Sequence, residues 1–298
     1  MKAILICPGE RPAVPQLAEF GPLSVIPVLG DSIVNHWVEH FAALGARRID
    51  IIASKGADSV TATVGNGARW GISVGVIAAR VEPTREEALG LCATSPETTW
   101  LPAPHDIVHI SHLPGCPELP LFESYASWFA ALAAWMPRAL TPTRVRMAQV
   151  SPGIWVGSRA RVSESARLAA PCWIGDQVII GDHAFVGPGA IIEDRSVVDE
   201  KATVTQSWVG PDTFVGSMTA VTDSLAWGPT LTSWQTDSSL RVPDPFLLSS
   251  LSAVPAGATS EGTGRAFERR QPIASFFATL RARVARGIDP KPARYGGG

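Results

Sequence analysis

Hydrophobic positions in the middle of the chain recur every six residues. A period of six fits neither an α-helix, whose apolar face returns about every 3.6 residues, nor a single alternating strand. It predicts a repeating coil with a short strand in each hexad, in which two inward residues flank one outward residue. The aliphatic positions are Val156, Val162, Leu168, Ile174, Ile180, Val186, Ile192, Val198 and Val204.

Small residues and glycines complete this repeat. The residue two places before each aliphatic is mostly small, and glycine follows several of them, as at Gly175 and Gly181. Three such strands per turn predict a triangular parallel β-solenoid with turns of about eighteen residues. After Val204 the spacing drops once to five and then resumes at Val209, Val215 and Val221. Residues 154–222 are therefore predicted to form one continuous solenoid with a shortened loop.

The pattern resembles the hexapeptide-repeat family, whose members form left-handed β-helices. The left-handed winding is implied by this resemblance and not by the spacing.

One outer wall of the predicted solenoid is unusually apolar. Strand side chains alternate, so the residue before each inward aliphatic points outward. On one wall these residues are Trp155, Trp173, Ile191 and Trp208. Such a ridge is more apolar than a monomer usually leaves in water. We expect the N-terminal region, a C-terminal helix or a second subunit to cover it, so the chain is predicted either to be a homo-oligomer or to pack its own domains through this wall.

The first 150 residues show a different pattern, in which apolar strands alternate with amphipathic helices. This alternation predicts a parallel sheet with helices on both faces. A Thr84–Glu87 capping box precedes one short helix. Ligands bind beyond the carboxyl ends of such strands, which directs attention to the loop after Cys7. The predicted strands are 3–7, 49–53, 72–78 and 107–110, and the main helices are 33–44 and 122–135.

The N-terminal region also resembles the sugar-1-phosphate nucleotidyltransferases. The resemblance rests on the loop 8–12, the segment 22–30, residues 44–52 and the junction 152–157. It implies a shortened Rossmann-like nucleotidyltransferase domain followed by a left-handed β-helix. The predicted division is residues 1–150, 151–230 and 231–298, the last being a linker and a basic helix.

The resemblance also implies site residues, and here the chain departs from the family. Gly9, Glu10 and Arg11 take the place of the phosphate loop, with Arg11 as the candidate catalytic cation. The family's lysine is replaced by Leu23, and its metal-binding carboxylate is missing near Ser111. Because phosphoryl transfer depends on placed cations, the prediction is a degenerate nucleotide-sugar synthase relative in bacterial polysaccharide metabolism, a binding or structural protein with weak or no turnover. A nucleotide or sugar phosphate is the expected ligand.

Two alternatives stay open. The first is an active nucleotidyltransferase with rearranged ligands, which would require Mg²⁺; no cofactor is otherwise predicted. The second is a hexapeptide-repeat acyltransferase with His183 as general base. The repeat runs past His183 without an insertion, which favours a solvated corner.

Histidines also gather near the predicted fourth strand. His105, Asp106, His109 and His112 are candidates for metal binding or acid–base work there. Unused surface residues are the commoner explanation of such a group.

Composition narrows the partners and the compartment. A net charge of -2 gives no reason to expect nucleic acid. Four cysteines without disulfide or CxxC spacing favour a reducing compartment. No apolar run reaches the roughly eighteen residues of a membrane span, and the short first strand does not fit a signal peptide. The expected location is cytoplasmic. Residues 249–264 are predicted as linker, and about 272–286 as a helix with apolar and arginine-rich sides.

Overall fold

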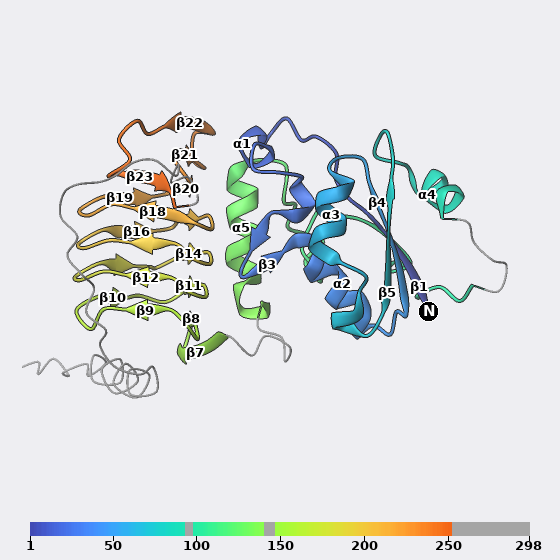
Figure 1. Cartoon of the computed structure of the whole chain (residues 1–298), viewed down its shortest axis with the longest axis horizontal. Helices are drawn as coiled ribbons and strands as arrows, with labels where there is room; N and C mark the ends of the chain where they lie inside the picture. Colours follow the sequence, from blue (N-terminus) through green and yellow to red (C-terminus); the bar gives the residue numbers. More distant parts are fainter. Residues whose placement is uncertain (93–97, 140–146, 252–298) are drawn as a thin grey trace, which may run out of the picture.

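The computed structural model of the chain describes residues 1–92, 98–139 and 147–251. Figure 1 shows an N-terminal α/β part, which ends at residue 139, beside a β-solenoid that begins at residue 147. The two parts meet along helix α5 (Tyr125–Trp135), which stands between them.

The N-terminal part is built on a four-stranded parallel sheet in the order β5-β4-β1-β6. All four strands were predicted, with ends that differ by at most one residue. Every residue of the first strand is buried, as its unbroken apolar sequence predicts for a central parallel strand. The strands are β1 (Lys2–Ile6), β4 (Arg48–Ala53), β5 (Ser73–Ala78) and β6 (Ile107–His109).

Helices pack on both faces of this sheet. On one face lie α2 (Ile33–Ala43) and α3 (Ala57–Val64), and on the other α4 (Arg85–Leu91). Ser32 caps α2 through its side chain, and the capping box of Thr84 and Glu87 is confirmed. Shorter pieces are α1 (Pro15–Ala18), the 3-10 turns η1 (Leu23–Val25), η2 (Ala68–Trp70) and η3 (Met136–Arg138), and the hairpin strands β2 (Pro27–Val28) and β3 (Asp31–Ser32). None of the helices in the described ranges combines the length and apolar character needed to cross a bilayer.

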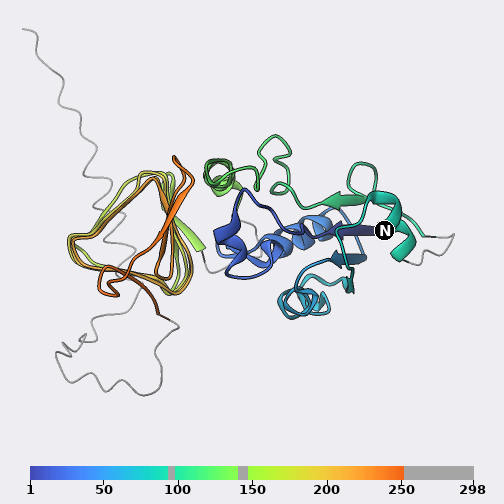
Figure 2. The same cartoon turned by 90° about the horizontal axis from the view of Figure 1, so that it is seen from above.

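The solenoid has three walls, and Figure 2 shows its triangular cross-section. The tryptophan wall contains β8 (Ile154–Gly157), β11 (Cys172–Ile174), β14 (Ala190–Ile192), β17 (Trp208–Val209) and β20 (Ser224–Trp227). The second wall contains β9 (Arg161–Val162), β12 (Ile179–Ile180), β15 (Val197–Val198) and β18 (Thr213–Val215). The third wall contains β10 (Arg167–Leu168), β13 (Phe185–Val186), β16 (Thr203–Thr205) and β19 (Ala220–Thr222).

Neighbouring coils pair in parallel, in the register that the six-residue period predicts. Along the tryptophan wall Trp155, Trp173, Ile191, Trp208 and Leu225 are successive partners, so the turn shortens from eighteen residues to seventeen after Ile191. The inward aliphatics form one buried core inside the triangle. A parallel β-solenoid with the predicted six-residue repeat is therefore present.

Antiparallel strands close the ends of the coil. β7 (Met147–Ser151) pairs antiparallel with β8, and β21 (Thr230–Ser233) and β22 (Ser238–Arg241) continue the tryptophan wall beyond β20. β23 (Leu248–Ser250) pairs antiparallel with β18. Residues 231–251, expected as the beginning of a linker, thus contain three strands. The helix expected near 272–286 and most of the linker expected at 249–264 lie outside the described residues.

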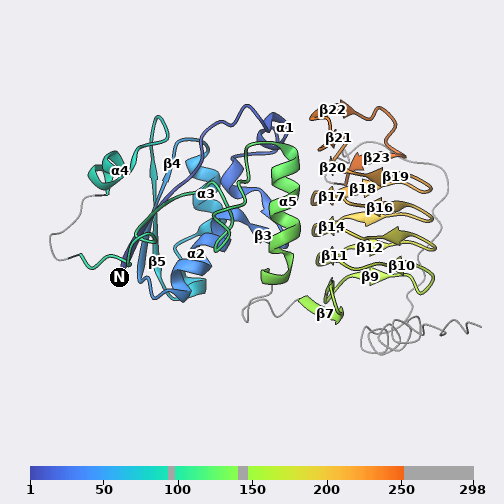
Figure 3. The same cartoon turned by 180° about the vertical axis from the view of Figure 1, so that it is seen from behind.

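The tryptophan wall is covered by the N-terminal part. Trp173, Ile191 and Trp208 are fully buried, and Trp155 is nearly so. They belong to the same apolar cluster as the core between the sheet, α2 and α5. Figure 3, seen from behind, also places α5 along this wall.

Candidate functional site

At the carboxyl edge of the parallel sheet, the loop after β1 meets the segment after β5. The Gly9 N–H donates to Glu82 Oε2 at 2.8 Å, and Arg11 Nη2 lies 2.8 Å from the same oxygen. Glu10 turns outward and pairs with Lys55 at 2.7 Å. The predicted phosphate-binding residues therefore contact carboxylate and ammonium groups of the chain itself.

Glu82 is held in its charged form at this edge. Partial burial alone would raise its pKa, but the Gly9 N–H, then Arg11 and the nearby His109, outweigh it and keep the pKa of Glu82 below its ordinary value. His109 Nδ1 is 3.7 Å from Glu82 Oε1. An internal carboxylate thus occupies the place where the loop would hold an anion.

Sequence reasoning missed both Glu82 and Lys55. Each follows a predicted strand, β5 and β4, so each belongs to the same edge as Gly9. The rule that directed attention to the loop after Cys7 applies equally to these segments. The signal was present but was used for one strand only.

The predicted histidine group does not form a common site. Asp106 pairs with Arg85 at 2.6 Å. The His105 ring faces His40, with ring centres 5.7 Å apart, and the His112 ring packs edge-on against Trp37. Within the described ranges no group of three or more His, Cys, Asp or Glu side chains could hold a metal ion.

His183 lies at the solenoid corner between the second and third walls. Its side chain is exposed and its backbone is left-handed, with φ of 58°. The His183 N–H donates to Ser165 Oγ at 3.0 Å, and Ser165 Oγ in turn donates to Asp182 Oδ1 at 3.3 Å. In the next turn the Lys201 N–H donates to the Asp182 carbonyl at 2.8 Å. Bonds to the coils on both sides therefore fix the backbone that carries the imidazole.

Charged side chains of both signs lie around this corner. Lys201 occupies the same corner one turn further along. One turn earlier Arg161 and Arg167 stand on the two walls that meet there, paired with Ile179 and Phe185, the strand residues that flank His183. All three cations are exposed. Carboxylates share the corner, because Asp182 precedes His183, Glu164 stands one turn earlier, and Glu200 pairs with Lys201 at 2.6 Å. The corner therefore carries charges of both signs, with Arg161 and Arg167 on its two walls.

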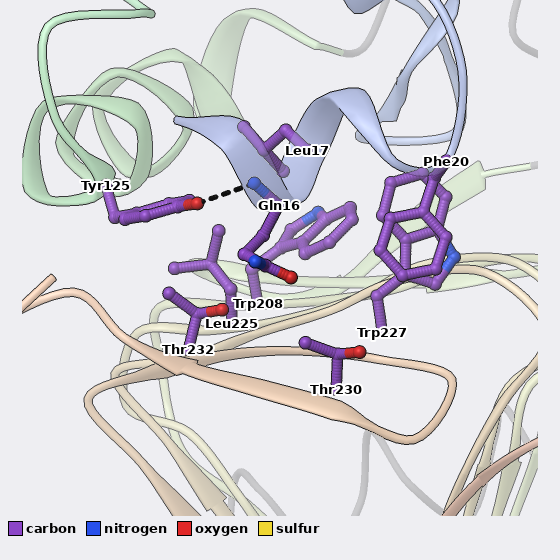
Figure 4. A pocket seen from close by; sticks show the side chains of 9 residues that line it. All are labelled: Gln16, Leu17, Phe20, Tyr125, Trp208, Leu225, Trp227, Thr230 and Thr232. Atoms are coloured by element: carbon purple, nitrogen blue, oxygen red, sulfur yellow. Dashed lines mark hydrogen bonds between the residues drawn. The ribbon is translucent and has the colours of Figure 1, made fainter. Parts of the chain in front are cut away.

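Two pockets of the described structure lie elsewhere. Figure 4 shows a small pocket where α1 and α5 meet the last coils. Beside it the Gln16 N–H donates a hydrogen bond to Tyr125 Oη at 2.9 Å. The ring of Phe20 stacks on that of Trp227, with ring centres 3.8 Å apart. This pocket is a gap in the joint between the two parts. A second pocket, at the C-terminal end of the solenoid, is lined by Pro229, Arg241, Val242, Pro243, Pro245, Leu248 and Ser249. Arg11 and His183 line neither pocket.

Comparisons with known proteins return structures but no sequence family. No protein-family model matches the chain, and no curated protein does. The acetyltransferase domain of PglB from Neisseria gonorrhoeae, solved with acetyl coenzyme A, is 13% identical, with 61% of this chain and 88% of that chain covered and a TM-score of 0.22. A mutant perosamine N-acetyltransferase from Caulobacter crescentus, solved with CoA and GDP-perosamine, is 16% identical, with 60% and 92% covered and a TM-score of 0.17.

The predicted function as a degenerate nucleotide-sugar synthase is wrong. Both of these similar structures are acetyltransferases, and neither is a nucleotidyltransferase. Within the chain, the physical reason lies at the sheet edge. The Gly9 amide and Arg11, which would face a phosphate, are bound to the negative charge of Glu82. The α/β part stands as a four-stranded parallel sheet with helices on both faces, without a nucleotidyltransferase assignment.

Proposed function

We propose that this chain is an acyltransferase of the hexapeptide-repeat type, with a left-handed solenoid, and that His183 is its general base. The donor is an acyl thioester of coenzyme A, and the acceptor is the hydroxyl or amino group of a small molecule. The observation that carries the proposal is the His183 corner, where an exposed imidazole stands on a fixed backbone with Arg161 and Arg167 on the adjoining walls. The uninterrupted repeat, which favoured a solvated corner, does not oppose this, because the corner needs no inserted loop to hold its shape.

The corner supplies the proton transfers of such a reaction. The His183 imidazole takes the proton from the acceptor hydroxyl or amine as that atom attacks the thioester carbonyl. A new bond forms between the acceptor and the acyl carbon, and the carbon–sulfur bond breaks as the tetrahedral intermediate collapses. The imidazolium returns the proton to the departing thiolate, so CoA leaves as a thiol and the histidine is neutral again.

Two arginines beside the corner fit the donor. Coenzyme A carries several phosphate groups, and Arg and Lys side chains are their usual partners in proteins. Arg161 and Arg167 belong to the turn before His183, and Lys201, which pairs with Glu200, belongs to the turn after it. The resemblance to hexapeptide acyltransferases further implies that such a base works in a cleft between subunits, which the partly exposed second and third walls leave room to form.

The test compares His183→Asn with Gln177→Asn. Both residues stand at exposed solenoid corners with φ of 58°, and Asn tolerates that conformation well. We expect the wild-type chain to release free CoA thiol from acetyl-CoA with an acceptor from a panel of amino and hydroxyl sugars. His183→Asn should lower kcat by about 10²- to 10⁴-fold, with an unchanged melting temperature, and Gln177→Asn should leave kcat as it is.

Two results would overturn the proposal. One is equal loss of turnover in both variants. The other is a folded wild-type chain that neither binds acetyl-CoA in calorimetry at millimolar concentration nor releases thiol with any acceptor.

A further inference from the structure

One carboxylate of the solenoid reaches out of the coil and into the N-terminal part. Glu193 follows the inward Ile192, at the position that is glycine in three other turns of the tryptophan wall: Gly157, Gly175 and Gly210. Its side chain is fully buried. Burying a carboxylate is costly unless its oxygens are hydrogen-bonded, so its partners define what it does.

All three partners of Glu193 are neutral N–H groups, and two belong to the other part of the molecule. The Leu29 N–H donates to Oε1 at 2.6 Å and the Gly30 N–H to Oε2 at 3.0 Å. Trp208 Nε1–H donates to Oε1 at 3.0 Å from the next coil. Leu29 and Gly30 form the tip of the β2–β3 hairpin, with φ of 51° and 84°. Successive amides in this conformation make a small concave site for an anion.

The charged groups around this contact come from both parts. Asp194 precedes Arg195 on the same corner and accepts the Asp176 N–H. On the N-terminal side Asp31 pairs with Arg69 at 2.8 Å, and His36 Nε2 is 2.8 Å from the Val28 carbonyl of the same hairpin. The titratable and charged groups near Glu193 are thus Asp176, Asp194, Arg195, Asp31, His36 and Arg69.

Glu193 titrates far from its ordinary range. Burial raises the pKa of Glu193 to about 7, and the negative charge of Asp194 adds to this effect, against the three N–H donors. In an opened joint the carboxyl group would meet water and return toward the ordinary value of 4.5. The closed joint therefore binds the proton more tightly than an opened one.

We propose that the contact of Glu193 with Leu29, Gly30 and Trp208 is a pH-sensitive lock between the solenoid and the N-terminal part. Because the pKa is raised in the closed form, the stabilisation from protonation is fully present below about 4.5 and is lost as the pH rises through about 7. Above that pH the closed joint holds an ionised carboxylate without a direct cationic contact among its three partners. The closed joint is therefore more stable in mild acid than in mild alkali.

Hydrogen exchange of the full chain tests the lock directly. The probes are the Leu29 and Gly30 amides and the Trp208 indole N–H, each corrected for the intrinsic pH dependence of exchange. In the wild type we expect protection to fall about tenfold between pH 6 and pH 8, as linkage with these two pKa values requires. In Glu193→Gln, which keeps an acceptor oxygen but does not titrate, protection should not change with pH over this interval.

Two control variants distinguish the titration of Glu193 from that of other groups. Glu200→Gln removes an exposed solenoid carboxylate, and His36→Gln removes the histidine behind the hairpin; both should keep the wild-type pH dependence. Protection that is flat with pH in the wild type would refute the lock. So would a pH dependence that survives in Glu193→Gln or disappears in His36→Gln. Because the wild-type series stands by itself, the test remains decisive if a variant fails to fold.

Discussion

At the scale of single residues, the solenoid needs glycine, which has no side chain, at some of its corners. Gly187 has φ of 92°, and a Cβ placed there would lie 1.9 Å from the Ala169 carbonyl oxygen of the preceding coil. Gly45, which ends α2, has almost the same φ of 89°, but a Cβ there would meet nothing within 4 Å. The two glycines therefore share a backbone conformation and differ in the space around them.

Alanine substitutions at these two glycines distinguish the cost of backbone strain from the cost of a steric clash with the neighbouring coil. Gly45→Ala should cost about 1 kcal/mol of unfolding free energy, since only the left-handed conformation opposes the new methyl group. Gly187→Ala should cost more than about 3 kcal/mol, because the coils must also move apart. Urea unfolding of the two variants measures the difference. Equal losses of unfolding free energy in the two variants would show that the corner at Gly187 accommodates a Cβ without a clash, against the structure.

At the scale of the strand, the alternation of inward and outward residues decides what each position tolerates. β12 consists of Ile179, which is half-buried on the second wall, and Ile180, which is buried in the coil core. The two residues have the same chemistry and are adjacent, and the pleat alone sends them to opposite sides.

Ile180→Asp should therefore unfold the coil and Ile179→Asp should not. An unpaired carboxylate in the stacked core costs several kcal/mol, on the order of 4, whereas at Ile179 the carboxylate reaches water and the loss should stay near 1 kcal/mol. Circular dichroism melting of both variants checks this. A cooperative melt of Ile180→Asp at the wild-type midpoint would contradict the stacked core.

The elements that a local pattern defines were predictable, and those that distant contacts define were not. The six-residue period predicted the strands of the solenoid, and the capping box at Thr84 predicted the start of a helix. Helix α3 was missed, since it starts after the left-handed Gly56 without a side-chain cap and is rich in β-branched residues. Strands β21 and β22 were missed because they follow the end of the repeat.

The candidate sites divide in the same way. His183 and the tryptophan wall follow from spacing along the chain. Glu82 reaches Gly9 across 73 positions, and Glu193 reaches Leu29 across 164. No periodicity links such partners. Only the replacement of a recurring glycine by Glu193 could have marked that residue as unusual.

At the scale of the whole molecule, the two parts share one apolar core. The tryptophan wall contacts α5, where Trp128 meets Trp208 edge-on at 6.4 Å and Phe129 stacks on Trp234 at 5.4 Å. Trp173 lies under the hairpin tip, within 3.5 Å of where a Cβ of Gly30 would be. The parts should consequently unfold together.

Trp173→Glu should break this coupling. It places a carboxylate in a fully buried position of the joint, at a cost of several kcal/mol, on the order of 4, so the single melting transition should fall and divide into two. Phe214→Glu makes the same kind of change on the half-buried second wall and should cost about 1 kcal/mol. Calorimetry of both variants measures this, and an unchanged single transition in Trp173→Glu would show that the joint does not couple the parts.

The antiparallel strands at the ends of the tryptophan wall also govern how the protein behaves at high concentration. A parallel coil that ended bluntly would offer a row of unpaired amides and carbonyls on which another molecule could continue the stack. Here β7 lies across the first coil with reversed direction, and β22, exposed at every residue and ending in Arg241, forms the opposite edge. Fibre growth along the solenoid axis, molecule upon molecule, is opposed on this wall by the same few residues that terminate the coil.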